Sequence, residues 1–150
     1  MNIGIGFFIA KILGMTGKTL IGQLNRRRDM VLRKSISIAA GGMAGAILRF
    51  LVRSIHFPAD IPLGTLVVNV LGSFLLALIL TAAMDSFRIN EDIRAGVTVG
   101  FFGAFTTFSS VCQESVAFLV GGQTAVAAVY LVLTTGLGMA AAFAGYRLAH

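Results

Sequence analysis

Two long uncharged stretches constrain this chain more than any other feature of its sequence. Residues 61–84 are 24 consecutive positions without a charged side chain. The 52 residues between Arg94 and Arg147 contain a single charged side chain, that of Glu114. A helix needs about 20 apolar residues to cross a bilayer. The first stretch therefore predicts one membrane span and the second predicts two. A further apolar run, from about Ser35 to Val52, raises the expected number to four.

Helices are the expected form of these spans, because lipid offers no partners for unpaired backbone groups. We place them at about 33–54, 62–84, 94–119 and 123–147, with short connections that predict antiparallel neighbours. The composition agrees, since 57% of residues are hydrophobic, 12% are charged and the mean hydropathy is +0.90. The fold class is therefore an all-α, multi-pass membrane protein without a soluble domain.

Most of the positive charge lies before the first span or at its start. Seven of the twelve Lys and Arg residues fall in the first 34 positions. Such a cluster indicates a cytoplasmic topology signal beside anionic lipid, not nucleic acid binding. The apolar run at 3–10 is too short to span, and its charges follow it, the reverse of a secretory signal. We expect 1–29 to be a disordered or interfacial extension, with Met30 as an alternative start, and 30–150 to form the four-helix domain.

Other chemistry is not expected. The segment GMTGKT at 14–19 resembles the end of a phosphate-binding loop, but Ile12 stands where that loop needs a glycine. Cys112 is the only cysteine and has no partner in the chain. No nucleophile, base and orienting group occur together, so the chain is not expected to be an enzyme.

Small residues recur in the first and last spans, as in GGMAGA at 41–46 and from Gly136 to Gly145. Lipid provides little hydrophobic drive between helices, so close backbone approach through such residues supplies van der Waals contact instead. We expect most of them to serve helix packing. Four short helices have little interior, so extensive small-residue faces also favour an oligomer.

Four polar side chains inside the spans need an explanation. Arg49 lies deep enough that it should face protein or water, because inserting an arginine at the centre of a membrane helix costs about 2.5–3.5 kcal/mol. Arg53 lies one turn later and its side chain can reach the membrane interface. Asn69 is either an interhelical hydrogen-bonding residue or a pore-lining donor. Glu114 is either functional or interfacial at the end of a shortened helix.

The last span adds Tyr130 and Thr134, which are four residues apart and share one helix face. The third span contains a denser cluster, GAFTTFSSV at 103–111, with hydroxyls at Thr106, Thr107, Ser109 and Ser110. One or two such hydroxyls commonly bond to their own helix. Four in five positions, beside two glycines, predict a helix break that must be buried in protein or line a watery cavity.

A broken helix offers ligands of both signs, because freed carbonyls can bind a cation and freed amides and hydroxyls can bind an anion. Phe108 sits inside the cluster, and an aromatic ring has a positive edge that can meet a small anion. Packing is nevertheless the commoner role of phenylalanine.

Three motifs resemble the CrcB/Fluc family of fluoride channels. They are GGMAGAILRF (41–50), PLGTLVVNVLGSF (62–74) and GVTVGFFGAFTTFSS (96–110), followed by Glu114 and Tyr130. The resemblance covers about 30–150. It implies a four-helix subunit with a broken third helix, paired as an antiparallel, dual-topology-type dimer with two fluoride pores. Such a channel lets fluoride leave the cytoplasm passively through the inner or plasma membrane, and so protects the cell.

The resemblance also implies roles for individual residues. A structural sodium ion would lie at the dimer centre, held by the backbone carbonyls of Gly103 and Thr106. The residues of the fluoride pore would be Asn69, Phe108, Ser109, Ser110, Tyr130 and Thr134. Arg49 and Glu114 are candidate charges of the pore or its vestibule.

The chain departs from the family pattern at three positions. Val111 stands where a second pore phenylalanine is usual, so we expect one ion station to be weakened. Ala104 replaces a common glycine, and Gly138 lies where another hydroxyl is frequent. Positive charge is also biased to one side of the membrane. We therefore hypothesise a dimer either with a second copy or with a related chain of opposite orientation that supplies a complete phenylalanine pair.

Two rival functions remain open at this point. A small proton-coupled exporter would need a carboxylate in the first span, where this chain has Arg49. A non-conducting membrane subunit would need only the glycine packing, and would leave Asn69 and the hydroxyl cluster unexplained.

Overall fold

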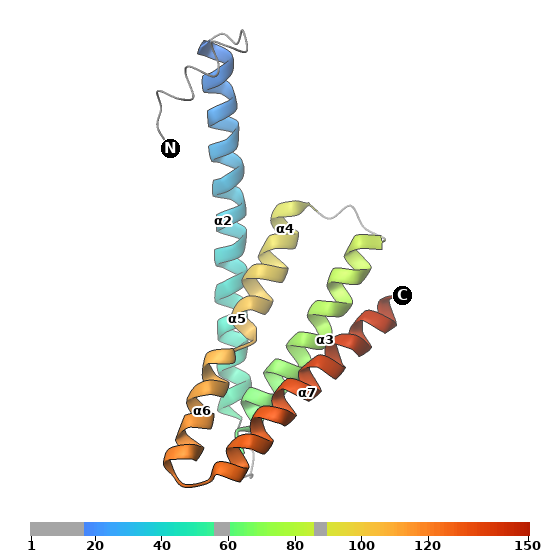
Figure 1. Cartoon of the computed structure of the whole chain (residues 1–150). Coiled ribbons are helices and arrows are strands. Elements are labelled where there is room, and N and C mark those ends of the chain that lie inside the picture. Colours follow the sequence, from blue (N-terminus) through green and yellow to red (C-terminus); the bar gives the residue numbers. More distant parts are fainter. Residues whose placement is uncertain (1–16, 56–60, 86–89) are drawn as a thin grey trace.

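The computed structural model describes residues 17–55, 61–85 and 90–150 (Figure 1). Within these ranges all regular elements are helical, and four segments are long and apolar enough to cross a membrane. They are α2 (Gly17–Ser54), α3 (Leu63–Asp85), a composite third span (Glu91–Val120) and α7 (Thr124–Ala149). The prediction of an all-α membrane protein with four spans is confirmed.

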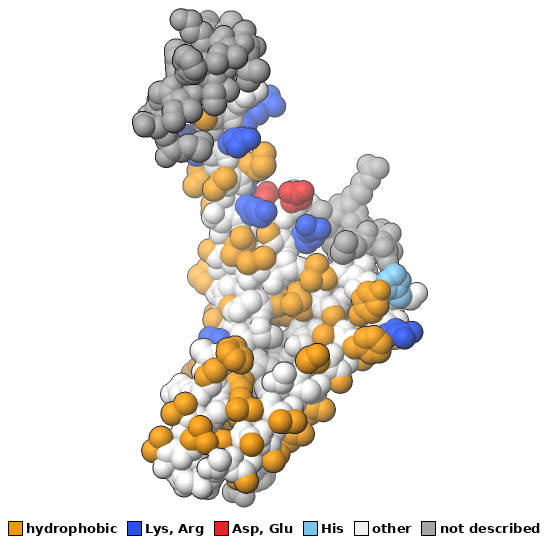
Figure 2. Space-filling view, in the orientation of Figure 1, with side chains coloured by type: hydrophobic (Ala, Val, Ile, Leu, Met, Phe, Trp, Pro, Cys, Tyr) orange, Lys and Arg blue, Asp and Glu red, His pale blue; other side chains and the backbone are white. Residues whose placement is uncertain are grey.

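The first helix begins well before the expected span. α2 has 38 residues, which is about 57 Å at the rise of an α-helix and exceeds a hydrocarbon core of about 30 Å. Residues 17–29 of the expected extension belong to α2, while 1–16 lie outside the described ranges. The basic side chains at 26–28, 33 and 34 are exposed on this helix (Figure 2). An interfacial position for this segment stays a prediction.

The third span is built from four pieces. They are α4 (Glu91–Ala95), the π-helical η1 (Gly96–Phe102), α5 (Gly103–Phe105) and α6 (Phe108–Val120). The Asn90 side chain caps α4 by accepting a hydrogen bond from the Asp92 amide. Between α5 and α6 the backbone is extended, with ψ of 153° at Thr106 and φ of −149° at Thr107.

Close packing joins helices that are not neighbours in sequence. α3 lies along α7 and α2 lies along η1, each pair running in the same direction (Figure 1). A Cβ at Gly45 would overlap the carbonyl oxygen of Phe101, and one at Gly145 would overlap that of Phe74. The predicted close approach through glycines is confirmed at these positions. Neighbours in sequence run antiparallel, as expected, but the tightest contacts are between alternate helices.

A small aromatic core lies where the third span crosses α3. Val68, Phe102 and Phe105 are buried together, and Phe101 packs on them with its ring stacked on that of Phe105 at 5.8 Å between centroids. This core holds α5 in place immediately before the extended residues.

At the other end of α6, Gly122 takes a φ of 76° and makes the tight turn into α7, a conformation that favours glycine.

Candidate functional site

Asn69 on α3 binds the extended segment of the third span directly. Its Nδ2 donates to the Thr107 carbonyl at 3.1 Å, and its Oδ1 accepts from the Thr107 amide at 2.8 Å. In a continuous helix the Thr107 amide would instead bond to the carbonyl of Gly103. Asn69 therefore replaces a helical hydrogen bond and leaves the Gly103 carbonyl without it. The second N–H of the amide is still available to a ligand.

The Thr107 side chain also replaces a helical hydrogen bond, this time at the start of α6. Its Oγ1 accepts a hydrogen bond from the Ser110 amide at 3.2 Å and so caps the start of α6. That amide would otherwise bond to the Thr106 carbonyl. The Thr106 hydroxyl is turned away and donates to the Phe102 carbonyl at 2.8 Å. Helical hydrogen bonds are thus diverted from the carbonyls of Gly103 and Thr106, the pair predicted to hold a cation.

A groove of about 420 Å³ is lined by α3, the extended segment, α6 and α7. It brings together Asn69, Phe108 and Thr134 from the predicted pore, and Val111 also lines it. The Phe108 ring is 77% exposed, so it is presented at the surface and is not packed in the core. The buried Thr134 Oγ1 has no hydrogen-bond partner among the described residues. The groove therefore brings neutral hydrogen-bond donors and an aromatic ring together.

A second group of polar residues gathers around Glu114 on α6. Its Oε1 accepts from Thr65 at 2.7 Å and from Arg53 at 2.9 Å, and its Oε2 accepts from Tyr130 at 2.6 Å. Arg53 also donates to Ser110 at 3.0 Å. The carboxylate is thus held by side chains of α2, α3 and α7. Glu114 is therefore a hydrogen-bonded residue at a helix junction, and its position relative to the membrane interface stays a prediction.

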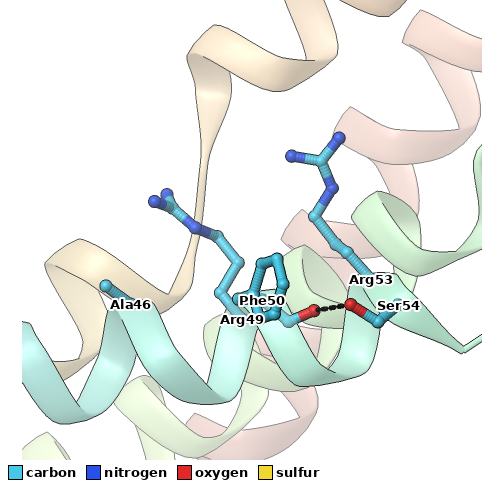
Figure 3. Close-up of a pocket in the computed structure, with 5 residues that line it drawn as sticks. All are labelled: Ala46, Arg49, Phe50, Arg53 and Ser54. Carbon is cyan, nitrogen blue, oxygen red and sulfur yellow. Dashed lines mark hydrogen bonds between the residues drawn. The ribbon is translucent and has the colours of Figure 1, made fainter.

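Two arginines of α2 flank a pocket of about 400 Å³ with Phe50 and Ser54 (Figure 3). Both guanidinium groups extend from the same side of the helix. Arg53 is paired with Glu114, and its position at the membrane interface stays a prediction. Arg49 is half-buried and makes no hydrogen bond or ion pair with the other described residues.

The predicted pore residues therefore fall into two places. Tyr130 and Ser110 belong to the cluster around Glu114. Ser109, the other serine of the predicted pore, is exposed and its hydroxyl lies 3.2 Å from that of Thr107. Sequence reasoning missed Thr65, which is 1% exposed and bonded to Glu114. Its position one turn before Asn69, on the same helix face, was the available signal.

Among the described residues, no group of three or more His, Cys, Asp or Glu side chains is placed to hold a metal ion. Backbone carbonyl oxygens are another class of ligand that can hold a cation. The carbonyls of Gly103 and Thr106 have the chemistry to do so, since unwound carbonyls in broken membrane helices coordinate Na⁺.

Comparisons with known proteins identify the family to which the chain is similar. Residues 36–146 match the family described as CrcB-like protein, Camphor Resistance (CrcB). The fluoride-specific ion channel FluC of Thermosipho melanesiensis is 40% identical over 119 residues, which cover 77% of this chain and 94% of the relative. The protein of the same name from Thermus thermophilus is 37% identical over 120 residues, covering 78% and 95%. The chain belongs to the CrcB-like family.

Proposed function

We propose that this protein is a subunit of a fluoride-selective channel that lets cytoplasmic fluoride leave the cell passively. The observation that carries the proposal is the groove beside the extended segment, in a chain whose relatives are named fluoride-specific ion channels. The protein acts as a channel and not as an enzyme.

The groove suits a small anion that must bind without being trapped. Asn69, Phe108 and Thr134 supply an amide N–H, a ring edge and a hydroxyl, none of which carries a full charge. Conduction requires binding that is strong enough for entry and weak enough for exit. The full charge of Arg53 is neutralised by Glu114, outside the set of residues that line the groove.

The interruption between α5 and α6 is the proposed break in the third span, and it supports a structural sodium site. When bound, the ion would supply a fixed positive charge that holds the carbonyls of Gly103 and Thr106 in place. Asn69 and Thr107 keep those carbonyls free by taking the amides that would otherwise bond to them. The cation thus requires backbone geometry and no charged ligand.

The exposure of the same segment supports a dimer. Gly103, Phe108 and Ser109 are exposed in the single chain, yet irregular backbone at membrane depth must be covered by protein or line water. A second subunit of opposite orientation would cover it and complete the pore. Either another copy or a related chain can fill that place, and the Val111 departure favours a related chain with a complete phenylalanine pair.

Passive export needs no coupled energy source. Fluoride enters cells as neutral HF and is trapped as the anion at neutral pH. An inside-negative potential then drives the anion outward, with about 2.3 kcal/mol per charge for each 100 mV. Four spans with a polar groove are sufficient for this task.

The test is anion efflux from liposomes that hold the purified channel as it assembles in the membrane. We expect fluoride efflux without chloride efflux, and loss of fluoride efflux in Asn69→Asp and Phe108→Ile. The matched control is Phe143→Ile, a similarly exposed ring on α7 at 60%, which should conduct normally. Equal efflux of both anions, or of neither, would refute the channel.

A further inference from the structure

Ser73 on α3 was not among the residues predicted to bind the anion, yet it lines the same groove as Asn69 and Thr134. It lies one turn after Asn69, so both side chains are on one face of the helix. Across the groove it faces Gly138 of α7, where an added Cβ would lie 3.7 Å from the Ser73 hydroxyl oxygen. The two helices therefore meet here with a hydroxyl on one side and no side chain on the other.

The Ser73 hydroxyl has no hydrogen bond to any other part of the described chain. Serine in a membrane helix commonly donates to the carbonyl one turn earlier. Ser54 and Ser115 do so here, to Phe50 at 2.8 Å and Val111 at 2.7 Å. Ser73 makes no such hydrogen bond, so its hydroxyl remains available as a donor at the groove.

Thr134 provides an independent observation on the facing helix. It is 7% exposed, and its hydroxyl is buried without a partner among the described residues. A buried hydroxyl without a hydrogen bond is unfavourable unless water or a ligand supplies one. Two unpartnered hydroxyls from α3 and α7 thus line a single groove beside Phe108.

We propose that Ser73 is an anion-binding residue of the groove. Its hydroxyl on α3 lies opposite Gly138 of α7, a residue that has no hydroxyl of its own. This inference depends on the proposed fluoride channel and adds a residue to it. The Ser73 hydroxyl and the Thr134 hydroxyl then donate to the same ion from opposite walls. Gly138 keeps the space between them open.

The alternative is that Ser73 is only a small packing residue opposite a glycine. The two roles differ in what happens when the hydroxyl is moved across the groove. A packing role depends on the volume at each position, whereas an anion-binding role depends on a donor being present on either wall. Gly138→Ser can introduce that donor, because a Cβ there makes only ordinary van der Waals contact with Ser73.

The experiment measures the initial rate of fluoride efflux from liposomes and its dependence on fluoride concentration. Ser73→Ala and Ser73→Gly should each slow efflux by about fivefold, the effect of losing one hydrogen bond. The double variant Ser73→Gly with Gly138→Ser should return to within about twofold of the unaltered channel. Ser115→Ala removes a hydroxyl that is bonded within its own helix and should conduct normally.

Each outcome decides the matter once size-exclusion chromatography shows that every variant assembles as the unaltered channel does. Normal efflux by Ser73→Ala overturns the inference and leaves the channel intact. A double variant no faster than Ser73→Gly overturns it as well. If the unaltered channel moves no fluoride, the proposed function fails and this inference fails with it.

Discussion

The Arg53 guanidinium lies 2.9 Å from the Glu114 carboxylate and joins the end of α2 to α6. The same carboxylate accepts hydrogen bonds from Thr65 on α3 and Tyr130 on α7. One side chain of the third span therefore connects all three other spans. Glu114 acts as the junction of the bundle at the end where α6 turns into α7.

Removing either partner of this pair should destabilise the protein by different amounts. Arg53 is 41% exposed, so Arg53→Gln should cost about 1 kcal/mol, as for exposed ion pairs. Glu114→Leu should cost more, because it leaves the Thr65 and Tyr130 hydroxyls unpaired at about 1–3 kcal/mol each. Thermal unfolding of the detergent-solubilised protein checks the order, with Arg49→Gln as the unpaired control. Equal losses for Arg53→Gln and Glu114→Leu would contradict it.

Two glycines allow a matched test of helix packing. Gly45→Ala should lower the unfolding temperature, because its Cβ would overlap the Phe101 carbonyl, a backbone atom that cannot rotate away. Gly136→Ala meets nothing within 4 Å and should be neutral or stabilising by up to about 1 kcal/mol through helix propensity. The contact between α2 and η1 would be unimportant if both variants unfolded at the same temperature.

Placing an aromatic ring at position 111 should lower the stability of the protein and raise its fluoride conduction. The valine is 2% exposed and lines the groove, so Val111→Phe should cost about 1–3 kcal/mol through overpacking. Its ring edge should nevertheless raise fluoride efflux from liposomes. Val111→Leu adds volume without a ring and should lose stability without gaining efflux. A gain in both variants would show that size, not the aromatic edge, matters.

Sodium removal should abolish efflux without any change of sequence. Dialysis against buffers in which N-methylglucamine replaces sodium should abolish fluoride efflux, because the carbonyls of Gly103 and Thr106 lose their cation. Adding sodium back should restore the rate, whereas the same concentration of choline should not. Efflux that persists after exhaustive exchange would exclude a required sodium ion.

Much of the site follows from the sequence through local rules. Asn69, Phe108 and Thr134 stand out as polar or aromatic residues in apolar runs, and the structure brings them to one groove. Tyr130 shares a helix face with Thr134, but its hydroxyl bonds to Glu114. That choice depends on a carboxylate 16 residues away, which helix periodicity cannot specify.

The sequence by itself determined the membrane class, the four spans and the polar cluster of the third, because apolar length and side-chain chemistry are local properties. Tertiary structure decided that α2 pairs with η1 and α3 with α7, that Arg53 meets Glu114, and that Ser73 faces Gly138. Each of these depends on which helix surfaces approach most closely. Steric fit between small residues far apart in the chain sets that choice, and span length carries no information about it.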